Sequence, residues 1–88
     1  MVYVDKLRRY SGRWINPMWC HMWADTEKEM FDMAKKIGLD VSDLMISKRG
    51  FRHFDLQPSK RKLALSLGTS ESSLKNVLRN MRKAPNTY

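Results

Sequence analysis

The clearest hydrophobic pattern in the chain follows Thr26 and has the repeat of an amphipathic helix. Apolar residues recur at helical spacing at Met30, Ala34 and Ile37. Thr26 and Glu29 have the spacing of a capping box, in which the Thr hydroxyl accepts a hydrogen bond from the N–H three residues later. Gly38 ends the repeat, as glycine commonly does just beyond a helix. The sequence therefore predicts a capped helix over about residues 27–37.

Shorter stretches alternate apolar and polar residues, as strands do when one face is buried. Residues 1–5 and 51–56 both show this alternation, and the apolar residues 44–46 predict a third, short buried strand. Side chains alternate across a strand, so one face of 51–56 carries Phe51, His53 and Asp55. Residues 6–18 predict a loop, because Gly12 and Pro17 interrupt any repeat.

Two further helices are predicted after Pro58, over residues 58–67 and 71–82. Gly68 would close the first, and Ser70 would cap the second. The apolar residues at the positions that such a pair shares are Leu63, Leu67, Leu74 and Val77. These spacings are typical of a helix-turn-helix unit. An αα-hairpin that only closes the core would show the same spacings.

The order of these elements predicts one small α+β domain over residues 1–83. A short sheet of about three strands would be packed by the capped helix and by a C-terminal two-helix, helix-turn-helix-like unit. Residues 1–56 would form the strand-helix-hairpin part and 57–83 the basic two-helix part. Residues 84–88 would form a flexible tail.

Positive charge is concentrated in the second half of the chain. Residues 1–44 carry seven Lys and Arg against seven Asp and Glu, whereas residues 45–88 carry ten against two. The whole net charge of +8 therefore belongs to residues 45–88. Such asymmetry favours a polyanionic partner, above all nucleic acid. A basic face that only keeps the protein soluble is the alternative.

A nucleic-acid-binding protein is the first functional hypothesis, with DNA favoured over RNA and with no cofactor needed. The second helix would enter the major groove, where Asn reads adenine and Arg reads guanine. Flanking cations would contact phosphates and fix the register. The predicted nucleic-acid-binding residues are Lys60, Arg61, Lys62, Ser72, Ser73, Lys75, Asn76, Arg79, Asn80, Arg82 and Lys83.

A His/Asp site is the second hypothesis and would make the protein a metal-assisted phosphoester hydrolase or nuclease. His21 and Asp25 share a face if a helix or turn extends back to His21. If the strand at 51–56 lies near residues 1–5, the residues that could converge are Asp5, His21, Asp25, His53 and Asp55. Two imidazoles with carboxylates suit a divalent ion such as Zn²⁺ or Mn²⁺. Each of these residues also has an ordinary structural role to play, as a cap or a core histidine.

Several short motifs accompany these segments: Met1–Asp5, Trp19–Met22 with Ala24 and Asp25, Ile37–Leu39, Phe51–Leu56, and Arg61 with Ala64 and Gly68. With them, residues 1–68 resemble a family of small phage and bacterial proteins catalogued as domain of unknown function 4031. The chain departs from the family at Phe54, where Tyr is usual, and near Met30 and Phe31, where a Leu-His pair is usual. The resemblance implies a cytoplasmic setting, in the host cell if the protein is phage-encoded. It assigns no activity.

The third hypothesis is a protein-binding role. Seven methionines and three tryptophans are many for a short chain, and both types are frequent contacts at interfaces. The protein could form a homodimer, or bind and inhibit a host protein. No apolar run approaches the roughly 20 residues of a membrane span, so a membrane partner is not expected. The single Cys20 excludes an internal disulfide and fits a reducing cytoplasm.

Overall fold

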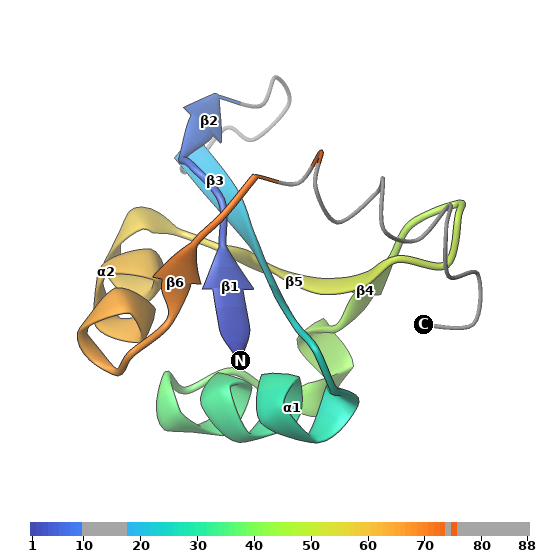
Figure 1. Ribbon diagram of the computed structural model, residues 1–88, viewed down its shortest axis with the longest axis horizontal. Coiled ribbons are helices and arrows are strands. Elements are labelled where there is room, and N and C mark those ends of the chain that lie inside the picture. Colours follow the sequence, from blue (N-terminus) through green and yellow to red (C-terminus); the bar gives the residue numbers. More distant parts are fainter. Residues whose placement is uncertain (10–17, 74, 76–88) are drawn as a thin grey trace.

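A computed structural model describes residues 1–9, 18–73 and 75. Its helices are α1 (Glu27–Lys36) and α2 (Pro58–Ser66), with one 3₁₀ turn at Val41–Asp43. Its strands are β1 (Val2–Val4), β2 (Arg8–Arg9), β3 (Met18–Ala24), β4 (Met45–Ile46), β5 (Arg52–Leu56) and β6 (Ser70–Glu71). The described part is thus an α+β fold with a mixed sheet (Figure 1).

The seven-residue strand β3 is the centre of the sheet. The strand order is β4-β5-β3-β1-β6, and β2 pairs with the other end of β3. All pairs are antiparallel except β1 with β6, which run parallel side by side (Figure 1). The register places Tyr3 opposite Trp23 and His21 opposite Asp55. Strands β1, β3 and β5, which are distant in sequence, are thereby aligned side by side.

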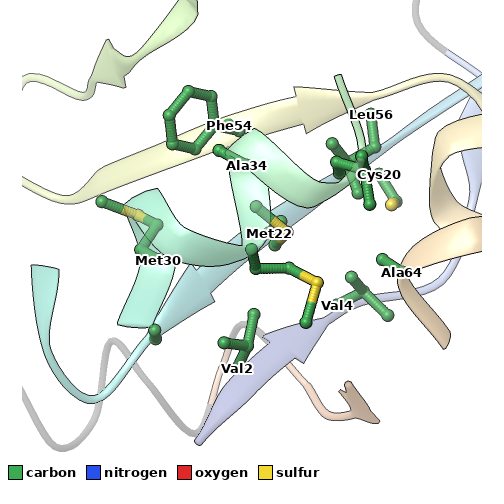
Figure 2. Close-up of a cluster of buried hydrophobic side chains, with 12 residues drawn as sticks. Val2, Val4, Cys20, Met22, Met30, Ala34, Phe54, Leu56 and Ala64 are labelled. Carbon is green, nitrogen blue, oxygen red and sulfur yellow. The ribbon is translucent and has the colours of Figure 1, made fainter. Parts of the chain in front are cut away.

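One face of the sheet is covered by both helices and forms the core. Alternation along the strands sends Val4, Met22 and Phe54 to this face. Helix α1 contributes Met30, Met33, Ala34 and Ile37, and α2 contributes Ala64. Figure 2 shows these side chains gathered between α1, α2 and the strands. The opposite face carries the odd-numbered residues of β3 and β5.

Helix α1 begins as its sequence predicts. The Thr26 hydroxyl accepts a hydrogen bond from the backbone N–H of Glu29 at 3.2 Å. The Glu29 carboxylate accepts from the Thr26 hydroxyl and from the Met1 amine. Glu27 and Glu29 lie in the first turn and Lys35 and Lys36 in the last, so both ends complement the helix dipole.

Replacing Thr26 with Ala is expected to lower the free energy of unfolding by about 1 kcal/mol, because the Glu29 N–H loses its acceptor. Urea denaturation followed by tryptophan fluorescence measures this change. Thr26→Ser is the matched control, because it keeps the hydroxyl and should stay near the parent. A Thr26→Ala protein as stable as the parent would show that the cap contributes nothing.

The predicted helix-turn-helix unit is wrong. After α2 the chain turns at Gly68 and forms β6, where a second helix was expected to begin. Strand β6 pairs with β1, and just after it the Ser72 N–H donates to the Val4 carbonyl at 2.9 Å. Leu63 and Leu67, predicted to face a partner helix, are 41% and 45% exposed.

The α+β class is confirmed, but a sheet of about three strands is wrong, since the described residues form six. The strands not predicted are β2 and β6, which have only two residues each, and β3, part of which was assigned to the loop at 6–18 or to a backward extension of the helix. Met45 and Ile46 do form a strand, yet both are exposed because β4 is the sheet edge. The predicted tail at 84–88, and Leu74 and Val77, lie outside the described residues.

Candidate metal centre

Three metal-ligating side chains meet on the sheet face opposite the helices. His21 comes from β3, and His53 and Asp55 come from β5. The register sets His21 directly opposite Asp55, and His53 lies two residues along the same face. One ligand atom from each of the three lies within 4.8 Å of the others. The two imidazole rings meet edge to face, with centroids 5.0 Å apart.

Asp5 holds His21 with both of its carboxylate oxygens. Oδ1 accepts from the His21 backbone N–H at 2.6 Å, and Oδ2 contacts His21 Nδ1 at 2.7 Å. Asp5 itself is buried, and its carbonyl accepts from Arg61 Nε at 2.9 Å. A carboxylate can only accept here, so Nδ1 of His21 carries a proton. In the neutral ring the lone pair therefore lies on Nε2.

His53 is oriented in the same way by a different acceptor. Its Nδ1 lies 3.1 Å from the Phe51 carbonyl oxygen, which also can only accept. The Phe51 ring stacks on the imidazole with centroids 5.0 Å apart. His53 Nε2 faces Asp55 Oδ1 at 3.5 Å. Both histidines thus donate the Nδ1 proton to an oxygen acceptor, as metal-bound histidines almost always do with the ring nitrogen that does not bind the metal.

This donor set fits a divalent transition ion. Two imidazole nitrogens and one carboxylate oxygen are the ligands of many catalytic sites that keep an open position for water or substrate. Ligands of a tetrahedral ion lie about 3.3 Å apart, so small side-chain movements would bring three atoms that lie within 4.8 Å of one another onto one ion. The side chains of His21 and Asp55 are 18% and 17% exposed, which leaves access from solvent.

Asp25 does not join this centre. Residues 18–24 form a strand rather than a backward extension of the helix, so Asp25 lies about 13 Å along the chain from His21. Its carboxylate accepts from the Tyr3 hydroxyl at 3.0 Å and pairs with the Met1 amine at 3.2 Å. The other four predicted residues, Asp5, His21, His53 and Asp55, are brought together.

Of the predicted nucleic-acid-binding residues that the structure describes, Lys60, Arg61 and Ser72 have contacts within the fold. Arg61 pairs with Glu71 at 2.7 Å and donates to the Asp5 carbonyl. Lys60 Nζ donates to the Ile37 carbonyl at 2.6 Å. Lys62, Ser73 and Lys75 are exposed, and Ser72 extends the pairing of β6 with β1. Asn76, Arg79, Asn80, Arg82 and Lys83 lie outside the described residues.

Cys20 lies on the core face beside the centre but takes no part in it. Burial, and secondarily the negative charge of Asp5, raise the pKa of its thiol to about 12, against the opposing effect of Arg61. The thiol therefore stays protonated at neutral pH, and a protonated thiol is a poor nucleophile. We expect no reaction of the native protein with Ellman's reagent at pH 8, and one thiol per chain in 8 M urea. Rapid labelling of the native protein would contradict this account.

Sequence reasoning included Asp5 but missed two other groups that orient the site. The Phe51 carbonyl is a backbone group and leaves no pattern in the side chains. Arg61 was predicted to contact phosphate, whereas it donates to the Asp5 carbonyl. The strand alternation that placed His53 with Asp55 was the usable signal. His21 was predicted to join them on the assumption of a helical turn, whereas the structure brings it there by antiparallel pairing of β3 with β5.

The fold and the site together define a small α+β protein with a candidate His/Asp centre on the sheet face opposite its two helices. The chain belongs to the family described as "Protein of unknown function (DUF4031)", whose model matches residues 2–84. This match confirms the resemblance and extends it beyond residue 68. No curated protein and no solved structure matches the chain. Neither helix of the described residues has the length and apolar character needed to cross a membrane.

Proposed function

We propose that the protein is a metal-dependent hydrolase that cleaves phosphoester bonds in nucleic acid. The observation that carries this proposal is the convergence of His21, His53 and Asp55 within 4.8 Å. In each imidazole Nδ1 contacts an oxygen acceptor, Asp5 for His21 and the Phe51 carbonyl for His53. In the neutral ring Nε2 is therefore available as a ligand nitrogen.

The roles of the residues follow from their contacts. Bound at the three side chains, a divalent ion would supply Lewis acidity to a phosphoryl oxygen and activate water. Asp5 fixes the tautomer and the orientation of His21, and the Phe51 carbonyl does the same for His53. The Phe51 ring restricts the rotation of the His53 imidazole. Arg61 holds the backbone of Asp5 and ties it to β6 through Glu71.

Charge supports nucleic acid as the substrate. The chain carries a net charge of +8, all of it in residues 45–88, and a basic protein attracts a phosphate backbone whatever its fold. Since the helix-turn-helix unit is wrong, this part of the proposal depends on charge and on the metal centre alone. Binding without cleavage would leave the protein a nucleic-acid-binding module.

The experiment is a metal titration of the full chain, prepared free of metal, followed by a cleavage assay. We expect Zn²⁺ or Mn²⁺ to bind with one ion per chain and to raise the melting temperature, because the ion binds only the folded site. The loaded protein should cleave a fluorescently labelled single-stranded DNA or RNA. Binding of neither ion at millimolar concentration would remove the proposal.

Replacing Asp5 with Asn should weaken metal binding by about 10- to 100-fold, the usual effect of losing a residue that orients a metal-binding histidine. The amide cannot accept from both the backbone N–H and Nδ1 of His21, so the ring loses its fixed orientation. Isothermal titration with Zn²⁺ measures the change, and circular dichroism checks that the variant is folded. A folded Asp5→Asn protein with unchanged affinity would show that Asp5 does not position His21.

A further inference from the structure

A pocket of about 370 Å³ adjoins the metal centre at Asp55. Its lining residues include Trp19 of β3, Met45 of β4 and Lys60 of α2. Asp43, which precedes β4, and Gln57, which follows β5, also line it. Strand β4 pairs with Arg52 and His53 of β5, and the pocket begins beyond this pairing, at Asp55. A group held in this pocket lies next to a metal ligand. The volume is at the lower end of small-ligand sites and suits a unit the size of one nucleotide.

Lys60 is a cation held in place at this pocket. Its Nζ donates to the Ile37 carbonyl at 2.6 Å, at the C-terminal end of α1. Gly38 has a φ of +82°, and a Cβ there would stand 3.0 Å from Nζ. The missing side chain at Gly38 therefore makes room for the ammonium. One hydrogen bond occupies only one of its three donors, so the others can bind a phosphate.

Trp19 supplies an aromatic wall to the same pocket. It is partly exposed, and it lies on the same sheet face as His21 because the two are separated by two residues of β3. Strand β2 places Arg8 opposite Trp19. An aromatic surface beside cations is the usual platform for single-stranded nucleic acid, since each base can stack while the backbone follows the charge.

The charge of the pocket predicts that an anion binds only after the metal. Asp43, Asp55 and Lys60 together leave one negative charge among the lining residues. A divalent ion at Asp55 would turn this into one positive charge. Metal and phosphate should therefore bind in order, the metal first.

We infer that this pocket is the substrate subsite and binds one nucleotide of a single strand, with its base on Trp19 and its phosphate on Lys60. The inference rests on the proposed function, because it needs the metal at Asp55. It specifies the substrate as unpaired nucleic acid: a base inside a duplex cannot stack on a protein side chain unless it is first unstacked.

The test measures binding of a labelled four-nucleotide DNA with phosphorothioate linkages, which resist cleavage, to the Zn²⁺-loaded full chain. Trp19→Ala should weaken binding by about 5- to 100-fold, and Trp19→Phe should restore most of it. Lys60→Gln should weaken binding and reduce the salt dependence of log K by about 0.7. Lys62→Gln is the matched control: it removes the same charge from an exposed position of the same helix. Free thymidine 5′-monophosphate forms the second arm and distinguishes a free nucleotide from a strand.

The results separate this inference from the proposed function. A protein that binds no Zn²⁺ removes both. A protein that binds Zn²⁺ but holds the DNA equally well after Trp19→Ala and Lys60→Gln removes only the subsite. Equal losses from Lys60→Gln and Lys62→Gln would show non-specific attraction and also remove it. Binding of the DNA that is as tight without metal as with it would contradict the ordered binding that the charges predict.

Discussion

His53→Ala is expected to abolish metal-dependent cleavage while leaving the fold intact. The variant removes one of the three proposed ligands. Losing even a residue that only orients a metal ligand costs about 10- to 100-fold in metal affinity, so we expect a loss of at least about 100-fold. Cleavage of labelled single-stranded DNA at a fixed Zn²⁺ or Mn²⁺ concentration should fall by a similar factor. Isothermal titration and the cleavage assay measure the two effects on the same preparation.

Asp25→Asn is the matched control for this prediction. Asp25 is a carboxylate in the same sequence segment as His21, but its contacts are with Tyr3 and Met1, away from the centre. Its loss should leave metal affinity and cleavage within about two-fold of the parent. Equal losses from His53→Ala and Asp25→Asn would contradict the assignment of ligands, as would a His53→Ala protein of full activity.

Phe54→Ala is expected to lower the free energy of unfolding by about 3–5 kcal/mol, the usual cost of removing a buried ring. Phe54 is completely buried in the core on β5, and its ring meets Phe31 edge to face at 6.1 Å. A domain of this size is stable by only about 5–15 kcal/mol. The melting temperature should therefore fall by roughly 15 °C or more. Urea and thermal denaturation measure both quantities.

Ile46→Ala provides the comparison for Phe54→Ala, because Ile46 is an apolar residue of the neighbouring strand that is 59% exposed. Its replacement should change the free energy of unfolding by no more than about 0.5 kcal/mol. A Phe54→Ala protein that loses less than about 1 kcal/mol would show that the core is not built on β5 as described.

Local signals in the sequence predicted the elements whose structure depends on local interactions. The capping pair Thr26 and Glu29 and the helical repeat predicted α1 almost to the residue, because a cap and an apolar face are properties of one segment. Pro58 and Gly68 bounded α2 in the same way. The alternation of β5 assigned His53 and Asp55 to one face correctly.

The missed elements depend on contacts between distant segments. Strand β6 forms because Ser70 and Glu71 meet the open edge of β1, some 67 residues earlier in the chain. Nothing in two residues predicts that partner, whereas Ser70 before Glu71 resembles a helix cap. The pairing of these residues with β1 outweighs the local preference for a helix cap, so the expected helix does not begin here.

The site was predicted in part for the same reason. Asp5, His21, His53 and Asp55 were predicted to converge, but only on the condition that β5 lay near β1. In the structure β3 lies between them, and this strand brings His21 to Asp55 directly. Asp25 was included because four residues span one turn of a helix; in a strand the same four residues separate the side chains widely.

The most direct test of the metal centre is an NMR measurement of the imidazole nitrogens, recorded without and with one equivalent of Zn²⁺. We expect His21 and His53 both to carry the proton on Nδ1 in their neutral form, and Zn²⁺ to shift the Nε2 resonances of both. Protons on Nε2, or Nε2 resonances that do not respond to Zn²⁺, would contradict the assignment of a metal to this site.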